Sequence, residues 1–362
     1  MKRILLTAFI IISIQSFSQE HASAGWYKMF AGKINNQPLT MHIHKADHGY
    51  SGYYYYDQQQ KPVYFTGDDT TVKGKVQLGA WMDPEVTEYF SFVVSDGALA
   101  GNWKKTEKGK PVDFSLAEVK MPKSFMYVFT SGVTKLRPKL KGSPESSFEA
   151  ESIWPEGNNP ADSFLKRMIR REFLAERSNK DIGIILVDDK KNHFKSYLED
   201  NKNEKDKDIL EMLTRYSSES SQKLMIFYRS GTMLGLSNYD FEYYGGAHGM
   251  YGISYVNIDL VHRKELALQD VLTKDGIKKL RPLLEKTFRV QMKLKPTDPL
   301  EQGGLLVDKI EPSKNFYLTG KGIGFGYNPY EIGSFAMGAI DIFIPYTELA
   351  AYLQPGFKTL IK

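Results

Sequence analysis

The stretch LTMHIHKADHGYSGYYYY, from Leu39 to Tyr56, indicates the fold class of the first third of the chain. Two runs of alternating side chains flank the sequence ADHG, whose aspartate and glycine are typical of a tight turn. Alternation over seven or eight residues is the pattern of a β-strand with one face buried. The stretch therefore predicts two neighbouring strands joined by a short turn.

The same pattern continues outward from this stretch, between Gly25 and Val119. About eight alternating runs are separated by turn residues: WYKMFAGKI, LTMHIHK, GYSGYYYY, PVYFTG, VKGKVQLGAWM, YFSFVVS, ALAGNW and VDFSLAEV. Eight short strands with tight turns favour an all-β meander that closes into a barrel, because closure removes unpaired strand edges. An open sandwich is the alternative.

The first residues have the pattern of a targeting sequence. Lys2 and Arg3 precede an apolar run from Ile4 to Ile14, and small residues follow up to Ser18. This order is typical of a cleaved secretory signal, expected over residues 1–19. The apolar run would rise only about 16 Å as a helix, whereas a bilayer core is about 30 Å thick. We therefore expect an exported protein, periplasmic or secreted, without a membrane span.

Composition narrows the class further. The 362 residues exceed one ordinary domain, and 41% hydrophobic residues suffice for packed cores. The chain has no cysteine, which excludes disulfides, thiol nucleophiles and thiolate metal sites. Loss of Lys2 and Arg3 with the signal would lower the net charge from +5 to +3. Such a small net charge argues against a nucleic-acid partner.

From residue 121 onward, helical patterns alternate with longer strands. The segment Asn158–Arg177 predicts a helix with Asn159 as its cap and Pro160 in the first helical position. A second helix is predicted over 275–292, where Pro282 either kinks it or marks its start. Shorter helices are predicted for DKDILEMLTRY and YTELAAYL.

Adjacent strands in this half look connected as hairpins, which favours an α+β domain with a mainly antiparallel sheet. The chain is thus divided into a signal peptide (1–19), an all-β module (20–120) and an α+β module (121–362).

The segment YYGGAHGMYG, Tyr243 to Gly252, is poor in both strand and helix formers. Its glycines allow sharp turns and would present His248 on a loop. As a binding loop, the segment offers these residues to a partner: Tyr243, Tyr244, Gly245, Gly246, His248 and Gly249. As a catalytic loop, it would use His248 as a general base oriented by Asp240 or Glu242. No nucleophile motif accompanies the histidine, so the binding interpretation is favoured.

Three segments resemble a known family. YYGGAHG, YVNIDL with LALQDVL, and NFYLTGKGIGFGYNPYEIGSFAMGAIDIFIPYTEL are similar to the C-terminal extracytoplasmic region of RsiV-type anti-sigma factors. Similar modules occur in PdaC-type peptidoglycan deacetylases and in exported proteins of unknown function. The resemblance covers roughly residues 125–353 and implies a non-catalytic binding module that senses lysozyme. Because we expect a cleaved signal and no membrane span, signalling across a membrane does not carry over.

The stretch GKGIGFGYNPYEIG, Gly320 to Gly333, alternates glycines with larger residues, so one strand face would be bare. The spacing of its glycines matches neither the Walker phosphate-binding loop nor the GxGxxG dinucleotide-binding motif. Tyr327, Tyr330 and Glu331 lie at or just after the end of this strand. We predict that Tyr243–Gly249 and Asn328–Gly333 form one contact surface for an extracytoplasmic protein or a cell-wall glycan. The alternative is that both segments pack together as core.

Two clusters in the first module are further candidates. His42, His44 and His48 would allow a metal ion between imidazoles on one strand face, although only Asp47 lies nearby as an acidic ligand. The run Tyr53–Tyr56 has rings suited to stacking on sugars, but alternation sends one of its two pairs into the core. Neither a metal nor a cofactor is predicted for the chain.

Overall fold

The computed structural model describes residues 21–47, 49–70, 75–82, 85–95 and 97–362. The expected signal peptide and His48 lie outside these ranges. No helix within them combines the length and the apolar character that crossing a membrane requires.

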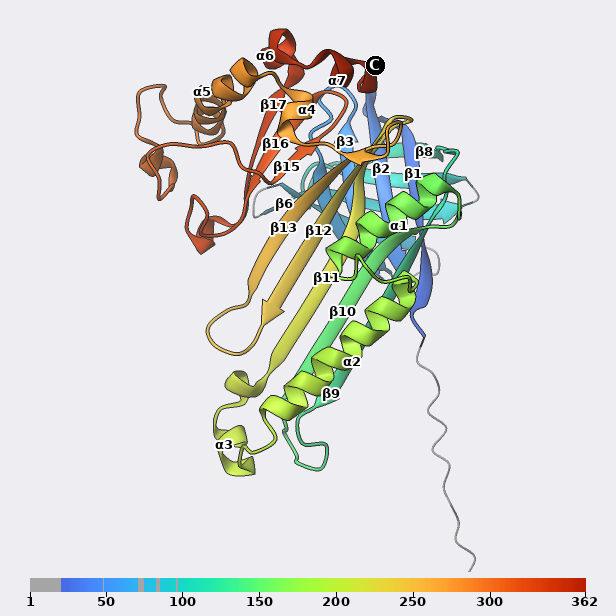
Figure 1. Ribbon diagram of the computed structural model, residues 1–362, viewed down its shortest axis with the longest axis vertical. Helices are drawn as coiled ribbons and strands as arrows, with labels where there is room; N and C mark the ends of the chain where they lie inside the picture. The colour runs from blue at the N-terminus through green and yellow to red at the C-terminus, as the bar shows by residue number, and fades with distance from the viewer. Residues whose placement is uncertain (1–20, 48, 71–74, 83–84, 96) are drawn as a thin grey trace, which may run out of the picture.

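Eight antiparallel strands form a closed barrel in the first module (Figure 1). They are β1 (Ser23–Ile34), β2 (Gln37–Ala46), β3 (Gly49–Tyr56), β4 (Val63–Asp69), β5 (Lys75–Met82), β6 (Glu85–Ser95), β7 (Ala98–Lys104) and β8 (Val112–Glu118). Each strand pairs with the next, and β8 returns to β1, where Phe30 lies opposite Glu118. The predicted eight-stranded meander is confirmed, and the open sandwich is wrong.

The second module continues the same sheet. Its strands are β9 (Phe125–Lys135), β10 (Glu145–Pro155), β11 (Ser218–Arg229), β12 (Met233–Tyr243), β13 (Met250–Asp259) and β14 (Lys264–Glu265). The first residues of β1 pair with β9, so β1 belongs to both the barrel and the following sheet. Among the strand pairs of the described residues, β10–β11 alone is parallel. The predicted α+β class with a mainly antiparallel sheet is confirmed.

Helices cover one face of this second sheet and its C-terminal end (Figure 1). They are α1 (Pro160–Glu172), α2 (Ile182–Asp200), α3 (Asp206–Glu211), α4 (Leu268–Val271), α5 (Lys274–Gln291), α6 (Tyr346–Leu349) and α7 (Pro355–Leu360), with 3₁₀ turns η1 (Leu213–Tyr216), η2 (Leu300–Gly303), η3 (Phe335–Met337) and η4 (Ala350–Tyr352). Asn159 caps α1 as predicted, by accepting the N–H groups of Ala161 and Asp162. Helix α5 runs through Pro282, so a start at that proline is wrong.

A small sheet of β15 (Phe316–Leu318), β16 (Gly322–Tyr327) and β17 (Ile340–Pro345) lies beside β13. Asparagine side chains join the two sheets: Asn257 donates to the carbonyl of Phe316 and accepts the N–H of Leu318, both at 2.8 Å. Asn328 likewise accepts the N–H of Ile253 at 2.8 Å. These bonds fix the end of β16 next to the start of β13.

The glycine face of β16 admits aromatic rings, as predicted. A Cβ on Gly324 would lie 2.0 Å from the ring of Tyr317, and one on Gly322 would lie 2.3 Å from the ring of Phe343. Only glycine at these positions lets the two neighbouring strands place their rings directly against the backbone.

The barrel and the second sheet share a core. Tyr53, Tyr54 and Tyr55 are at most 7% exposed, since Tyr54 points into the barrel while Tyr53 and Tyr55 pack outward on Phe227 and Tyr228 of β11. Stacking of sugars on Tyr53, Tyr54 and Tyr55 is therefore excluded, because these rings are buried; Tyr56 is half-buried, and its hydroxyl donates to Glu88.

His42 and His44 are fully buried in the same interface. The Tyr27 hydroxyl lies 2.9 Å from Nδ1 of His42, and Nε2 of His44 accepts the backbone N–H of Ile226 at 3.0 Å. Burial lowers the pKa of His44 to about 3 and that of His42 well below its usual value, so both are neutral near pH 7. The described residues contain no group of three side chains arranged to hold a metal ion. The two imidazoles instead join the barrel to β11.

Candidate functional site

The two loops predicted to form a contact surface meet around one ring, that of Phe335. His248, on the loop between β12 and β13, stacks on Phe335 with ring centroids 4.0 Å apart and planes inclined by 22°. Tyr330, on the loop after β16, lies 5.9 Å from the same ring, and Tyr251 lies 6.2 Å from it. We name His248, Tyr330 and Phe335 the aromatic tip.

The first loop is built so that its rings face solvent. Gly245 and Gly246 have φ of 85° and 98°, which favour glycine, and a Cβ on Gly249 would lie 2.4 Å from the ring of Phe241. Tyr243 anchors the loop by donating to the carbonyls of Thr214 and Gly246. Tyr244 is left 68% exposed, and His248 is also exposed.

The second loop presents Tyr330 in a similar way. Tyr330 has a φ of 70° and its side chain is 55% exposed, beside the exposed Glu331. Tyr327 differs from the other predicted contact residues, since its ring is buried and its hydroxyl donates to the carbonyl of Glu311. Tyr327 thus supports the loop from beneath. Phe335, which joins the two loops, was not among the predicted residues.

The carboxylates proposed to orient His248 lie on the other face of β12. Asp240 and Glu242 alternate with Phe241, whose ring lies on the side of Tyr251 and the aromatic tip. Glu242 instead accepts a hydrogen bond from Ser220, while Nδ1 of His248 lies 2.8 Å from the carbonyl of Gly249. The geometry therefore provides no acid–histidine pair for catalysis by His248.

The edge next to the aromatic tip is acidic. Burial, and to a lesser extent the negative charges of Glu242 and Glu172, raise the pKa of Asp240 to about 6. Glu219 is exposed and pairs with Tyr243 across β11 and β12. Glu219 and Glu331 therefore provide negative charge on the side of the tip, whereas Asp240 lies on the opposite face of β12.

Exposed apolar side chains also gather beside the first loop. The loop rests on η1, where a Cβ on Gly245 would lie 2.7 Å from the carbonyl oxygen of Arg215. The exposed apolar residues of α3, of η1 and of the start of β13 are Leu210, Met212, Leu213 and Met250. Clusters of large apolar residues on a surface are typical of interaction sites.

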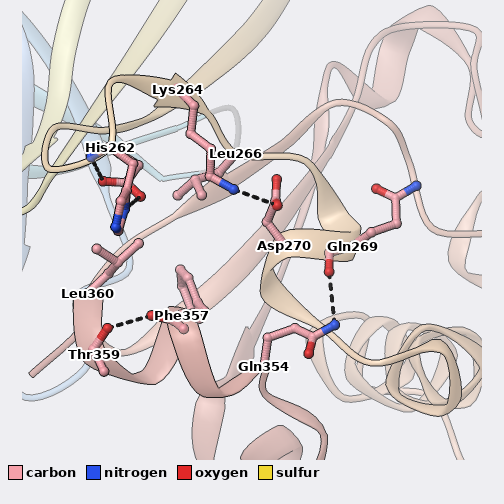
Figure 2. Close-up of a pocket in the computed structure, with 11 residues that line it drawn as sticks. His262, Lys264, Leu266, Gln269, Asp270, Gln354, Phe357, Thr359 and Leu360 are labelled. Carbon is pink, nitrogen blue, oxygen red and sulfur yellow. Dashed lines mark hydrogen bonds and ion pairs between the residues drawn. The ribbon is translucent and has the colours of Figure 1, made fainter.

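A second candidate lies at the opposite end of β13, in a cavity of about 640 Å³ between the β13–β14 turn, α4 and α7 (Figure 2). Buried Asp259 accepts the N–H groups of Val261 and His262, and its other oxygen lies 2.6 Å from Nδ1 of His262. The remaining groups are already paired: Lys264 with Asp270, and the Thr359 hydroxyl with a backbone carbonyl. Among the described residues that line the cavity, no nucleophile accompanies the Asp259–His262 pair. We therefore conclude that this pair stabilises the turn between β13 and β14.

Comparisons with known proteins agree with the fold. Residues 269–347 match a family described as "protein of unknown function (DUF3298)", so the chain contains a DUF3298 domain. The matched segment includes Tyr330 and Phe335 of the aromatic tip but not His248. No curated protein matches the chain.

Two solved structures are similar. A DUF3298 family member from Bacteroides fragilis is 24% identical, with a TM-score of 0.61 over 67% of this chain and 98% of that chain. A DUF3298 family protein from Pseudomonas aeruginosa is 17% identical, with a TM-score of 0.47 over 65% of this chain and 96% of that chain. The Bacteroides structure shows that the fold is one that occurs in this family.

Proposed function

We propose that the chain is an exported, non-catalytic binding module whose aromatic tip docks on a basic extracytoplasmic protein of the lysozyme type. The observation that carries the proposal is the stack of the exposed His248 ring on the half-buried Phe335 ring, which makes one surface from two loops distant in sequence. Rigid turns that present tyrosine and other aromatic rings are typical of the energetic centres of protein interfaces.

The resemblance of the loop segments to RsiV-type anti-sigma factors supports a lysozyme-like partner. The whole chain carries a net charge of +5, which gives no general attraction to a basic protein. Two exposed carboxylates lie on the side of the tip and can attract a basic partner: Glu219, opposite Tyr243 in the strand register, and Glu331, beside Tyr330. Such local complementarity speeds encounter and selects the partner's orientation.

The proposal is tested by titrating the chain without residues 1–19 against a lysozyme by isothermal calorimetry at low and at raised salt. We expect saturable binding that weakens as salt rises. Tyr330→Gly removes a ring at a position whose φ suits glycine, and His248→Ala removes the stacked imidazole. Each should weaken binding roughly tenfold or more, as for an interface hot spot.

Leu174→Ala is the matched control, since Leu174 is fully exposed on the α1–α2 connection. It should leave the affinity unchanged. Binding that survives both tip substitutions in folded protein would show that the partner docks elsewhere. An absence of binding by the unaltered chain would contradict the choice of a lysozyme-like partner.

A further inference from the structure

The two faces of the β9–β13 sheet have different surroundings. Helices α1 and α2 cover one face, where Phe148 packs against His193 and Phe194 (Figure 1). The other face packs on the barrel through β11, which contacts β2 and β3. Toward the aromatic tip this second face is partly open, with Val133 62% exposed and the Glu149 side chain 44% exposed.

The strand registers arrange the side chains of this face in two rows. Glu151, Lys223, Tyr239 and Ile253 lie opposite one another across β10, β11, β12 and β13. Glu149, Ser221, Phe241 and Tyr251 form the next row toward the tip. We name Glu149, Ser221, Lys223, Tyr239, Phe241 and Tyr251 the open face.

The open face places flat rings directly beside hydrogen-bonding groups. The ring centroids of Tyr239 and Tyr251 are 6.2 Å apart, and the two rings are stacked with their planes inclined by 27°. Next to them, Lys223 contacts Glu149 at 2.8 Å and Glu151 at 3.1 Å. Ser221 donates to Glu149 at 3.3 Å. The polar groups therefore lie on β10 and β11, and the rings lie on the adjoining strands β12 and β13.

We propose that the open face binds a neutral glycan chain, with Tyr239 and Tyr251 against the C–H faces of sugar rings and Glu149 and Lys223 bonding to hydroxyl or acetamido groups. This site adjoins the aromatic tip, because the Tyr251 ring lies 6.2 Å from that of Phe335, but its ligand differs from the protein partner proposed for the tip. A sugar ring has one apolar face and polar groups around its edge, which matches rings on two strands next to a carboxylate and an ammonium on the two adjoining strands.

The charges of the open face favour this ligand over others. Lys223 lies between two carboxyl groups, so the face has no excess of positive charge for a nucleic acid or an anionic lipid. An apolar lipid chain would remove water from the Lys223–Glu149 pair without replacing the hydrogen bonds that this water makes. Although burial opposes ionisation, the Lys223 ammonium holds the pKa of Glu149 below its usual value. Glu149 is then an ionised acceptor beside the rings.

The test uses chitohexaose, a soluble chain of N-acetylated sugars, titrated into the chain without residues 1–19, followed by co-sedimentation with purified peptidoglycan. We expect saturable binding of both. Tyr239→Ala should weaken chitohexaose binding about tenfold, whereas Tyr239→Phe, which keeps the ring, should stay within about threefold of the unaltered chain. Thermal melting of each variant verifies that it is folded.

Tyr330→Gly is the control that separates this site from the tip, because it should leave chitohexaose binding unchanged. Tyr239→Ala should in turn leave lysozyme binding unchanged. The proposal fails if the unaltered chain does not bind chitohexaose, if folded Tyr239→Ala binds it equally well, or if free wall peptide displaces the protein from peptidoglycan while chitohexaose does not. None of these results bears on docking at the aromatic tip.

Discussion

Mild acid should weaken the junction between the barrel and the second sheet, because the junction depends on two neutral histidines. His44 is fully buried, and its Nε2 accepts the N–H of Ile226. Burial lowers its pKa from 6.5 to about 3. His42 beside it is also fully buried, and burial, then the nearby positive groups, lowers its pKa well below 6.5.

The direction of the pH effect on stability follows from whether the folded or the unfolded chain binds the proton more readily. Below pH 6.5 the unfolded chain protonates His44 while the folded chain does not, until the pH approaches 3. The stability that neutral His44 contributes is therefore complete above pH 6.5 and declines between pH 6.5 and 3. At about pH 5 the loss is about 2 kcal/mol for His44, from roughly 1.4 kcal/mol per pH unit. The lowered pKa of His42, caused first by burial, acts in the same direction.

Urea unfolding followed by tryptophan fluorescence over a pH series measures this effect. Carboxyl groups complicate a scan of the unaltered chain, since burial, and then Asp188, raises the pKa of Asp189 to about 6 and gives it the opposite pH dependence. The difference between the unaltered chain and His44→Gln removes such shared contributions. That difference should shrink by about 2 kcal/mol between neutral pH and about pH 5.

His248→Gln, which changes an exposed imidazole, is the control and should follow the unaltered chain at every pH. A stability gap between the unaltered chain and His44→Gln that is the same at both pH values would refute the reasoning. It would mean that His44 is not a neutral acceptor held inside the junction.

Two further predictions concern the packing of the modules. Gly324→Ala should destabilise the fold by several kcal/mol, because its Cβ would lie 2.0 Å from the ring of Tyr317. Gly231→Ala is the control: a Cβ there has nothing within 4 Å, so stability should change by less than about 1 kcal/mol. Urea unfolding measures both variants, and equal stabilities would contradict the packing. Calorimetry should show one unfolding transition rather than two, since β1 pairs with both β8 and β9 and the core includes Tyr53 from one module and Phe227 from the other. Two separate transitions would favour independent domains divided near residue 120.

The success of the sequence predictions follows the range of the interactions involved. The barrel was predictable because each strand shows its own two-residue alternation, and α1 because Asn159 and Pro160 mark its start within a few residues. Helix α2 was not predicted, since its apolar residues run together from Ile182 to Val187 instead of recurring with a helical period. The role of Phe335 depends on His248, far away in sequence, and no local pattern reports such a contact.

The same limit explains why the candidate site was found only in part. Glycine and tyrosine in the 243–249 and 328–333 segments indicated exposed turns, which the structure contains. What brings the turns together is the asparagine bonding between β13 and the small sheet, through Asn257, Asn315 and Asn328. An asparagine outside a turn or cap carries no distinctive signal in a single sequence, so the joining of the two sheets was not predictable.

The two proposed surfaces can be told apart by physical chemistry as well as by mutation, although both lie along β12 and β13. Glu219 and Glu331 lie on the side of the aromatic tip, so its binding to a basic protein should weaken as salt screens these carboxylates. The open face pairs Lys223 with Glu149 and offers rings to an uncharged ligand, so its binding of chitohexaose should change little with salt. If both affinities fell together with salt, one charged surface would account for both, and the assignment of separate partners to the two surfaces would be wrong.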